Sequence, residues 1–90
     1  MQTYGESPRH PWIIDWQLLV LLLRRRSELS ATRIGRQCGS DERHINRIAR
    51  GEVAEPKFSV GVQILDLAAD HFTEDDWRQV RSRSLLARAA

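Results

Sequence analysis

The apolar residues of this chain recur at the spacing of amphipathic helices. Ile34 and Cys38 stand four residues apart, and Ile45 and Ile48 follow at helical spacing a short distance further on. Residues three or four apart share one face of a helix, so each pair predicts a helix with a buried side. Along the whole chain, this spacing predicts helices over about residues 12–26, 31–38, 42–50, 59–71 and 74–86. The sequence therefore predicts an all-α fold, a compact domain of five helices.

Residues that begin and end helices stand between these segments. Ser30 is a good N-cap for the second helix, and Ser40 or Asp41 caps the third. Gly39 and Gly51 allow the left-handed backbone on which helices commonly end. We therefore expect two short helices joined by a very tight turn near the middle of the chain.

The two ends of the chain are predicted to differ. Residues 1–10 show no periodicity, and we expect a flexible N-terminal segment there. Residues 11–90 then form a single domain. Towards its end, Thr73 and Asp76 stand at the spacing of a variant capping box, which predicts the start of the last helix.

The first helix is the most apolar part of the chain. Its run from Trp12 to Leu23 contains Asp15 and Gln17 and is too short to cross a bilayer, so we expect a buried core helix. Pro11 suits its first turn, and Asp15 is favourable at its positive end. Because apolar residues surround this helix, we predict a homodimer that forms through it or through the C-terminal helix.

Charge is distributed unevenly, although the net charge is only +2. Nine basic and five acidic residues lie between Arg24 and Lys57, whereas the segment from Phe58 to Asp76 carries five acidic residues and no lysine or arginine. A basic surface attracts polyanions and speeds their encounter with the protein. The middle of the chain is therefore suited to nucleic acid.

Residue types that support other chemistry are sparse. Cys38 is the only cysteine, so no internal disulfide can form, and three scattered histidines give no ligand spacing for zinc. No glycine-rich phosphate loop, carboxylate pair or nucleophile beside a base can be assembled. We therefore expect a protein that is not an enzyme, with no metal, cofactor or small-molecule ligand, in a reducing cytoplasm.

The tight turn has a mechanical consequence for the helix that follows it. Gly35 lacks the bulk that would hold the second and third helices apart, and Gly39 permits the turn between them. The outer face of the third helix is then free of core contacts and rich in hydrogen-bonding groups: Glu42, Arg43, His44, Asn46, Arg47 and Arg50. Arginine can contact guanine N7 and O6, asparagine pairs with adenine, and glutamate accepts from cytosine N4. A helix fits the major groove, so this face is predicted to read base edges in duplex DNA.

The segment from Leu29 to Gly51, with its continuation through Pro56, resembles the phage repressor and Cro family in its glycine, apolar and turn spacing. The likeness covers about residues 18–72. It implies a lambda-repressor-like domain in which residues 30–51 form a helix-turn-helix, dimers bind palindromic operators, and the second motif helix enters the major groove. It also implies a bacterial cell or a phage-infected host as the setting.

The resemblance implies roles for individual residues. The base-facing positions of the family match Glu42, Arg43, Asn46 and Arg47, and the positions near the phosphate backbone match Ser30, Arg50 and Lys57. To these we add His44 as a base reader and Thr32 and Arg36 as phosphate contacts. Three positions depart from the family. Ala31 replaces a glutamine that clamps a phosphate, Ser40 replaces an apolar residue, and Gly35 replaces an alanine that forms helices better. These departures lower the expected affinity or stability and leave the expected fold unchanged.

Two functions are consistent with this pattern. The first is a sequence-specific regulator of transcription, a Cro-like repressor that binds a double-stranded DNA operator as a homodimer. The second is a protein-interaction module, such as an antitoxin-like or assembly factor, that uses the same helical scaffold to bind protein. Salt-sensitive binding to duplex DNA would separate the two.

Overall fold

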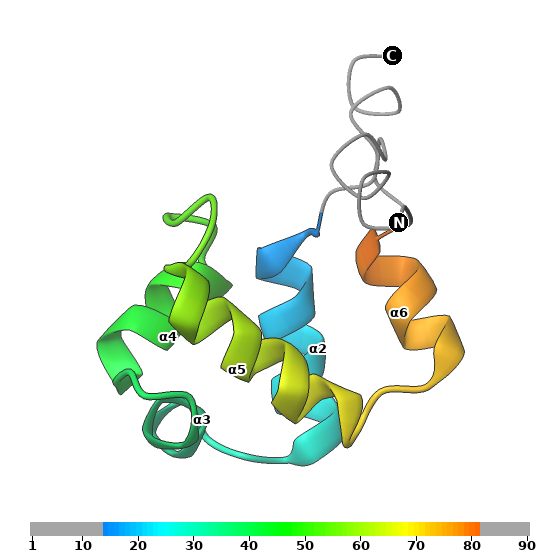
Figure 1. Ribbon diagram of the computed structural model, residues 1–90, viewed down its shortest axis with the longest axis horizontal. Helices are drawn as coiled ribbons and strands as arrows, with labels where there is room; N and C mark the ends of the chain where they lie inside the picture. The colour runs from blue at the N-terminus through cyan, green and yellow to red at the C-terminus, as the bar shows by residue number, and fades with distance from the viewer. Residues whose placement is uncertain (1–13, 82–90) are drawn as a thin grey trace, which may run out of the picture.

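The structure is a computed structural model that describes residues 14–81. This part of the chain holds five helices and no strand: α2 (Trp16–Ser27), α3 (Ala31–Gln37), α4 (Glu42–Ala49), α5 (Phe58–Ala69) and α6 (Glu74–Arg81). The compact all-α fold of five helices that the sequence predicts is confirmed (Figure 1). Within these residues, none of the helices is long and apolar enough to span a bilayer.

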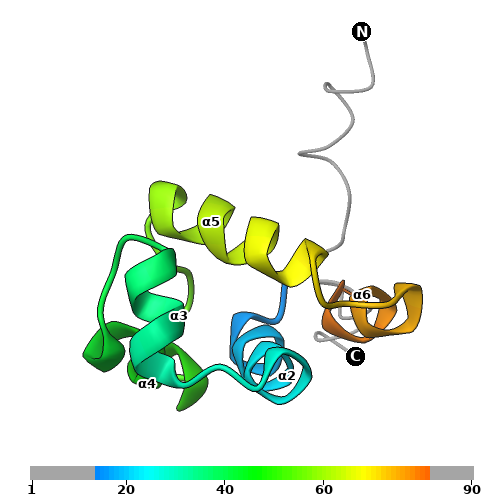
Figure 2. The ribbon, with the colours of Figure 1, turned by 90° about the horizontal axis from the view of Figure 1, so that it is seen from below.

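Helix α2 runs through the middle of the arrangement (Figures 1 and 2). Helices α3 and α4 pack against each other on one side of α2, α6 packs on the other side, and α5 crosses over α4 and α2. Apolar side chains that are fully buried come from all five described helices: Leu19, Val20, Leu23, Ile34, Ile45, Ile48, Ile64 and Val80. The core predicted around Ile34, Ile45 and Ile48 is therefore confirmed, and Cys38 is buried with it.

Helix α2, which corresponds to the first predicted helix, begins later than the sequence predicts. Residues 14 and 15 are not helical, and Asp15 Oδ1 accepts a hydrogen bond from the N–H of Leu18 at 3.2 Å. Asp15 is thus the N-cap rather than a residue of the first turn, because its carboxylate satisfies an N–H that the helix leaves unpaired. The other helix boundaries agree with the predictions to within two residues, up to Arg81. The predictions for residues 1–13 and 82–90 lie outside the described residues.

Gly35 marks the closest approach of α3 to the start of α4. A Cβ at this position would lie 2.6 Å from the carbonyl carbon of Asp41, far inside van der Waals contact. The neighbouring backbone is also fixed, because the N–H of Ser40 donates to the carbonyl oxygen of Gly35 at 2.7 Å. A glycine is therefore required here by packing, even though alanine forms helices better.

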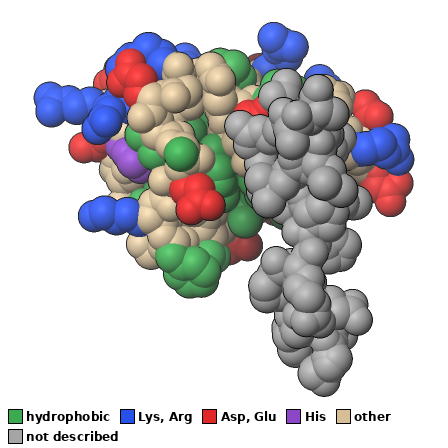
Figure 3. Space-filling model, turned by 90° about the horizontal axis from the view of Figure 1, so that it is seen from above, with side chains coloured by type: hydrophobic (Ala, Val, Ile, Leu, Met, Phe, Trp, Pro, Cys, Tyr) green, Lys and Arg blue, Asp and Glu red, His purple; other side chains and the backbone are tan. Residues whose placement is uncertain are grey.

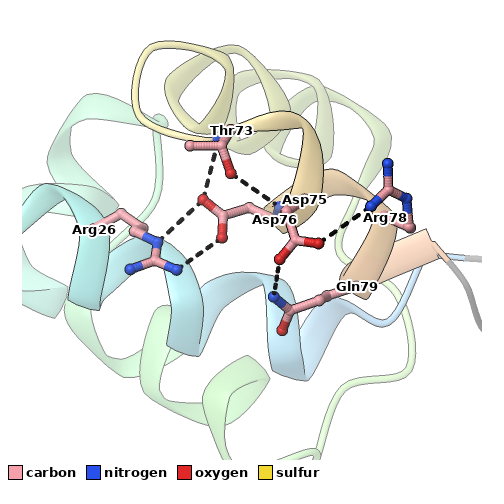
Figure 4. A network of polar contacts seen from close by, with 6 residues as sticks. All are labelled: Arg26, Thr73, Asp75, Asp76, Arg78 and Gln79. Atoms are coloured by element: carbon pink, nitrogen blue, oxygen red, sulfur yellow. Dashed lines mark hydrogen bonds and ion pairs between the residues drawn. The ribbon is translucent and has the colours of Figure 1, made fainter.

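Asp76 joins α6 to α2 through an ion pair in which its own carboxylate is buried and the Arg26 side chain is partly exposed (Figure 4). Its side chain is only 1% exposed and accepts hydrogen bonds from Arg26 Nη2 at 2.9 Å and from Arg26 Nε at 3.0 Å. Thr73 completes the predicted capping box, because its N–H donates to Asp76 Oδ2 and its Oγ1 accepts from the N–H of Asp76. The bidentate bond from Arg26, followed by the bond from Thr73, holds the pKa of Asp76 below its ordinary value.

This ion pair changes the interpretation of the basic and acidic segments of the sequence, because it joins a residue of one to a residue of the other. Asp76 is not part of an acidic surface, and Arg26 does more than balance the end of its own helix. At the other end of α6, the N–H of Asp15 donates to the carbonyl oxygen of Val80 at 2.9 Å. Since the start of each helix thus lies beside the end of the other, α6 runs antiparallel to α2.

We predict that Gly35→Ala destabilises the protein. The added methyl group meets backbone atoms of Asp41 that cannot turn aside, and overpacking of this kind costs roughly 1–3 kcal/mol, more than the helix propensity of alanine returns. Urea unfolding followed by circular dichroism measures the change. An unchanged or raised free energy of unfolding would show that α3 and α4 have room to separate.

The depressed pKa of Asp76 predicts a specific dependence of stability on pH. Its contribution is fully present above the unfolded-state pKa of about 3.9 and is lost as the pH falls through the lower folded-state pKa. Asp76→Asn should therefore be less stable than the wild type at neutral pH, and the difference should shrink in acid. Urea unfolding at several pH values tests this, with Asp75→Asn as the exposed control from the same turn. Parallel pH profiles for the wild type and Asp76→Asn would contradict the prediction.

Candidate nucleic-acid interface

Two capping interactions fix where α3 and α4 begin. Ser30 Oγ accepts a hydrogen bond from the N–H of Arg33 at 3.2 Å, and Asp41 Oδ1 accepts one from the N–H of His44 at 2.9 Å. Each side chain satisfies an N–H that helix geometry leaves unpaired. Of the two alternatives for the third predicted helix, Asp41 rather than Ser40 is the cap.

Both helices are followed by a glycine in the left-handed region. Gly39 has a φ of 71° and Gly51 a φ of 80°. After α4, the N–H of Glu52 donates to the carbonyl oxygen of Arg47 at 2.9 Å, and the N–H of Gly51 donates to that of Ile48 at 3.0 Å. These two bonds are those of the Schellman motif. They hold Glu52 close to the last turn of α4.

The inner face of α4 anchors the helix to the rest of the domain. Ile45 and Ile48 are fully buried, and Ala49 is nearly so. Gln17 of α2 adds a hydrogen bond, from its Nε2 to the carbonyl oxygen of Ala49 at 3.1 Å. Packing and this hydrogen bond together give the outer face of α4 a fixed direction relative to the core.

The predicted base-reading residues lie at different depths on α4. Glu42, Arg43 and Arg47 are exposed, whereas His44 and Asn46 are half-buried. Successive residues turn by about 100° around a helix, so His44 lies on the flank opposite Asn46. The five residues therefore do not form one row, and His44 and Asn46 flank the exposed arginines on opposite sides.

Arg43, Arg47 and Arg50 form an arginine row on the side of α4 opposite its buried residues. In Figure 3, Lys and Arg side chains project from the left edge of the described part, the side on which α4 lies in Figure 1. Acidic side chains lie close to them. The row presents guanidinium donors to solvent at a spacing of about one helical turn, which suits a ligand with repeated anionic or acceptor groups.

Glu52 pairs with two members of the arginine row. Its Oε2 accepts a hydrogen bond from Arg50 Nε at 2.7 Å, and its Oε1 lies 3.5 Å from Arg47 Nε. The bond from Arg50 lowers the pKa of the Glu52 carboxyl, and the same bond raises the pKa of Arg50. All three side chains remain about half-exposed. Sequence reasoning missed this contact, although Gly51 signals the turn that places Glu52 beside α4.

Thr32 and Glu42 form a further contact that the sequence does not predict. Thr32 Oγ1 donates a hydrogen bond to Glu42 Oε1 at 3.0 Å, and both side chains are exposed. The sequence predicts a phosphate contact for Thr32 and a base contact for Glu42. Because the hydroxyl holds the carboxylate, the structure ties the first residue of α4 to α3.

The remaining residues predicted to lie near phosphate belong to separate elements. Ser30 uses its Oγ as the cap of α3, and Arg36 is exposed in the last turn of that helix. Lys57 is exposed at the N-cap position of α5 and makes no side-chain capping bond. The phosphate contacts of these three residues stay predictions.

Three further features of residues 14–81 concern metal binding, thiol chemistry and surface hollows. No group of three or more His, Cys, Asp or Glu side chains there is arranged to hold a metal ion. Burial raises the pKa of the Cys38 thiol, which keeps it protonated and unreactive at neutral pH. An open hollow of about 200 Å³ is lined by Gln37, Gln63, Asp66, Leu67 and Asp70.

No protein-family model, curated protein or solved structure matches this chain. The interface described above is therefore defined by the chain's own residues and contacts. What the outer face of α4 binds is inferred from its geometry and its charge.

Proposed function

We propose that this protein is a sequence-specific regulator of transcription that inserts α4 into the major groove of double-stranded DNA. The observation that carries the proposal is the arginine row, which stands on a helix whose opposite side is locked into the core. Guanidinium groups match both the acceptor pair of guanine and the oxygens of phosphate. The helix backbone that carries these groups is already ordered, so it loses little conformational entropy on binding.

The residues of α4 divide into two roles in this proposal. Arg43 and Arg47 are the leading base readers, and Glu42 and Asn46 add discrimination between bases. Arg50, at the end of the helix, contacts the phosphate backbone and positions the protein. The protein acts as a homodimer on a palindromic operator, in the manner of a Cro-like repressor, because a small dimer bound over a promoter blocks it.

A second function, a protein-interaction module, is favoured by a different observation. Phe58 at the start of α5 is 86% exposed, and a large apolar side chain in water is typical of protein contacts. Glu52 also neutralises part of the arginine row. An antitoxin-like or assembly factor would bind a protein partner through such a surface and would not need DNA.

Selection from a library of random duplexes at moderate salt tests the proposal. Recovery of a twofold-symmetric site, with half-sites about one helical turn apart, is the expected result. Recovery of no motif, with weak binding that disappears as salt rises, would favour the protein-interaction module instead.

Arg43→Ala and Arg50→Ala are predicted to weaken DNA binding in different ways. Loss of a base reader costs roughly 1–3 kcal/mol and relaxes the preference at one base pair. Loss of a phosphate contact weakens binding on every duplex and flattens its salt dependence. Titrations against the selected site, single-base variants of it and an unrelated duplex separate these patterns. Identical losses for both variants on all duplexes would contradict the assigned roles.

Glu52→Gln is predicted to strengthen binding to every duplex. The neutral side chain releases Arg47 and Arg50 from their carboxylate partner, so more positive charge faces the phosphates and the salt dependence becomes steeper. The same titrations measure the change, and Glu55→Gln, which removes an equal charge from the same loop, is the control. Equal gains in affinity for the two variants would show that only the net charge of the protein matters. Weaker DNA binding by Glu52→Gln would show that Glu52 positions Arg47.

A further inference from the structure

Helix α5 carries a second row of apolar residues beside its buried row, and only Leu65 of this second row packs partly against the core. Val60, Ile64 and Ala68 point inwards and are buried. The second row stands at a spacing of four, three and four residues, and consists of Phe58, Val62, Leu65 and Ala69. Phe58 is 86% and Val62 40% exposed, Leu65 is half-buried and Ala69 is exposed. A single exposed apolar residue is ordinary, but an apolar row along a whole helix indicates a contact surface.

The charges at the two ends of α5 oppose the helix dipole. Lys57 stands at the N-terminal end, where the dipole is positive, and Asp70 stands at the C-terminal end, where it is negative. The first turn has no acidic residue and the last turn no basic one. Within one chain this arrangement is unfavourable, and a second α5 in the opposite direction would bring the complementary charges to both ends.

We infer that the second apolar row of α5 binds a second copy of this chain, with the two α5 helices antiparallel across a twofold axis. Such an axis places Val62 opposite Leu65 of the partner, and the large Phe58 opposite the small Ala69. It also brings the Lys57 end of one helix to the Asp70 end of the other. A parallel pair would instead bring like charges together.

This contact deepens the proposed function by naming the surface through which the homodimer forms, and its test needs no DNA. It also differs from the dimer that the sequence predicts through the first or last helix. Helix α2 exposes only one large apolar side chain, Leu21, among the described residues. One pair of short helices covers less than the roughly 800 Å² per partner of a standard interface, so the dimer is expected to be weak.

Sedimentation equilibrium of the full chain without DNA, up to millimolar concentration, tests the inference. The expected result is a reversible dimer that Phe58→Ser weakens roughly a hundredfold or more, because Phe58 enters the contact twice. Leu21→Ser, a similar change on α2, is the matched control and should leave the dimer intact. Circular dichroism confirms that both variants fold.

Charge reversal tests the antiparallel direction. Lys57→Glu and Asp70→Lys should each weaken the dimer, and the double variant should restore it. Each single reversal improves the match between α5 and its own dipole, so a weaker dimer cannot come from a damaged helix. Failure of the double variant to restore the dimer would overturn the antiparallel arrangement.

Other results overturn the inference directly. A monomeric mass at every concentration would show that the apolar row of α5 does not bind a second copy. If Phe58→Ser also lowered the Tm of that monomer, the row would be covered by residues of its own chain. If Leu21→Ser abolished the dimer and Phe58→Ser did not, the contact would lie on α2 and not on α5. Because the mass is measured without DNA, none of these results depends on whether the protein binds DNA.

Discussion

The backbone contact between Gly35 and Asp41 is the constraint on which the rest of this fold depends. It lets α3 and α4 approach more closely than side chains would allow, and it holds Asp41, the residue that caps the start of α4, against α3. From that point, the helical repeat sends Ile45 and Ile48 into the core and the arginine row to the opposite side. A single missing methyl group thus determines which residues of α4 can meet a partner.

The ion pairs among the described residues fall into two kinds, according to how far water reaches the carboxylate. The carboxylate of Asp76 is buried, with its hydrogen bonds supplied by Arg26 and Thr73, so breaking the pair would leave a charge without solvent. The carboxylate of Glu52 is half-exposed, and ion pairs at such sites contribute little to stability. The first kind fastens one helix to another. In the second kind, another anion such as a phosphate can replace the carboxylate as the partner of the arginine, with little change in the fold.

Much of the fold could be predicted from local sequence signals. Ser30, the pair Thr73 and Asp76, and the two glycines after α3 and α4 act on backbone atoms within a few residues, so their effect is visible in the sequence. Pro11 and Asp15 each signal a start for the same predicted helix. The hydrogen bond that Asp15 accepts from the N–H of Leu18 makes Asp15 the N-cap. Periodicity alone could not weigh one signal against the other.

The candidate site was less predictable, because it depends on side chains that meet across a turn. The helical repeat identifies the outward residues of α4, but not that Thr32 holds Glu42 or that Glu52 lies between two arginines. The bond between Arg26 and Asp76 joins residues far apart in sequence, and no local pattern marks it. Gly35 is the opposite case: helix propensity alone makes it a weakness, and the contact with Asp41 makes it necessary.

The hydrogen bond from Asp15 to Val80 has a consequence for the topology of the chain. It joins the two ends of the described part of the chain, so the start of α2 and the end of α6 lie side by side. A circularly permuted chain, joined near residues 15 and 80 and opened in the loop between α4 and α5, would keep each helix and each helix cap in place.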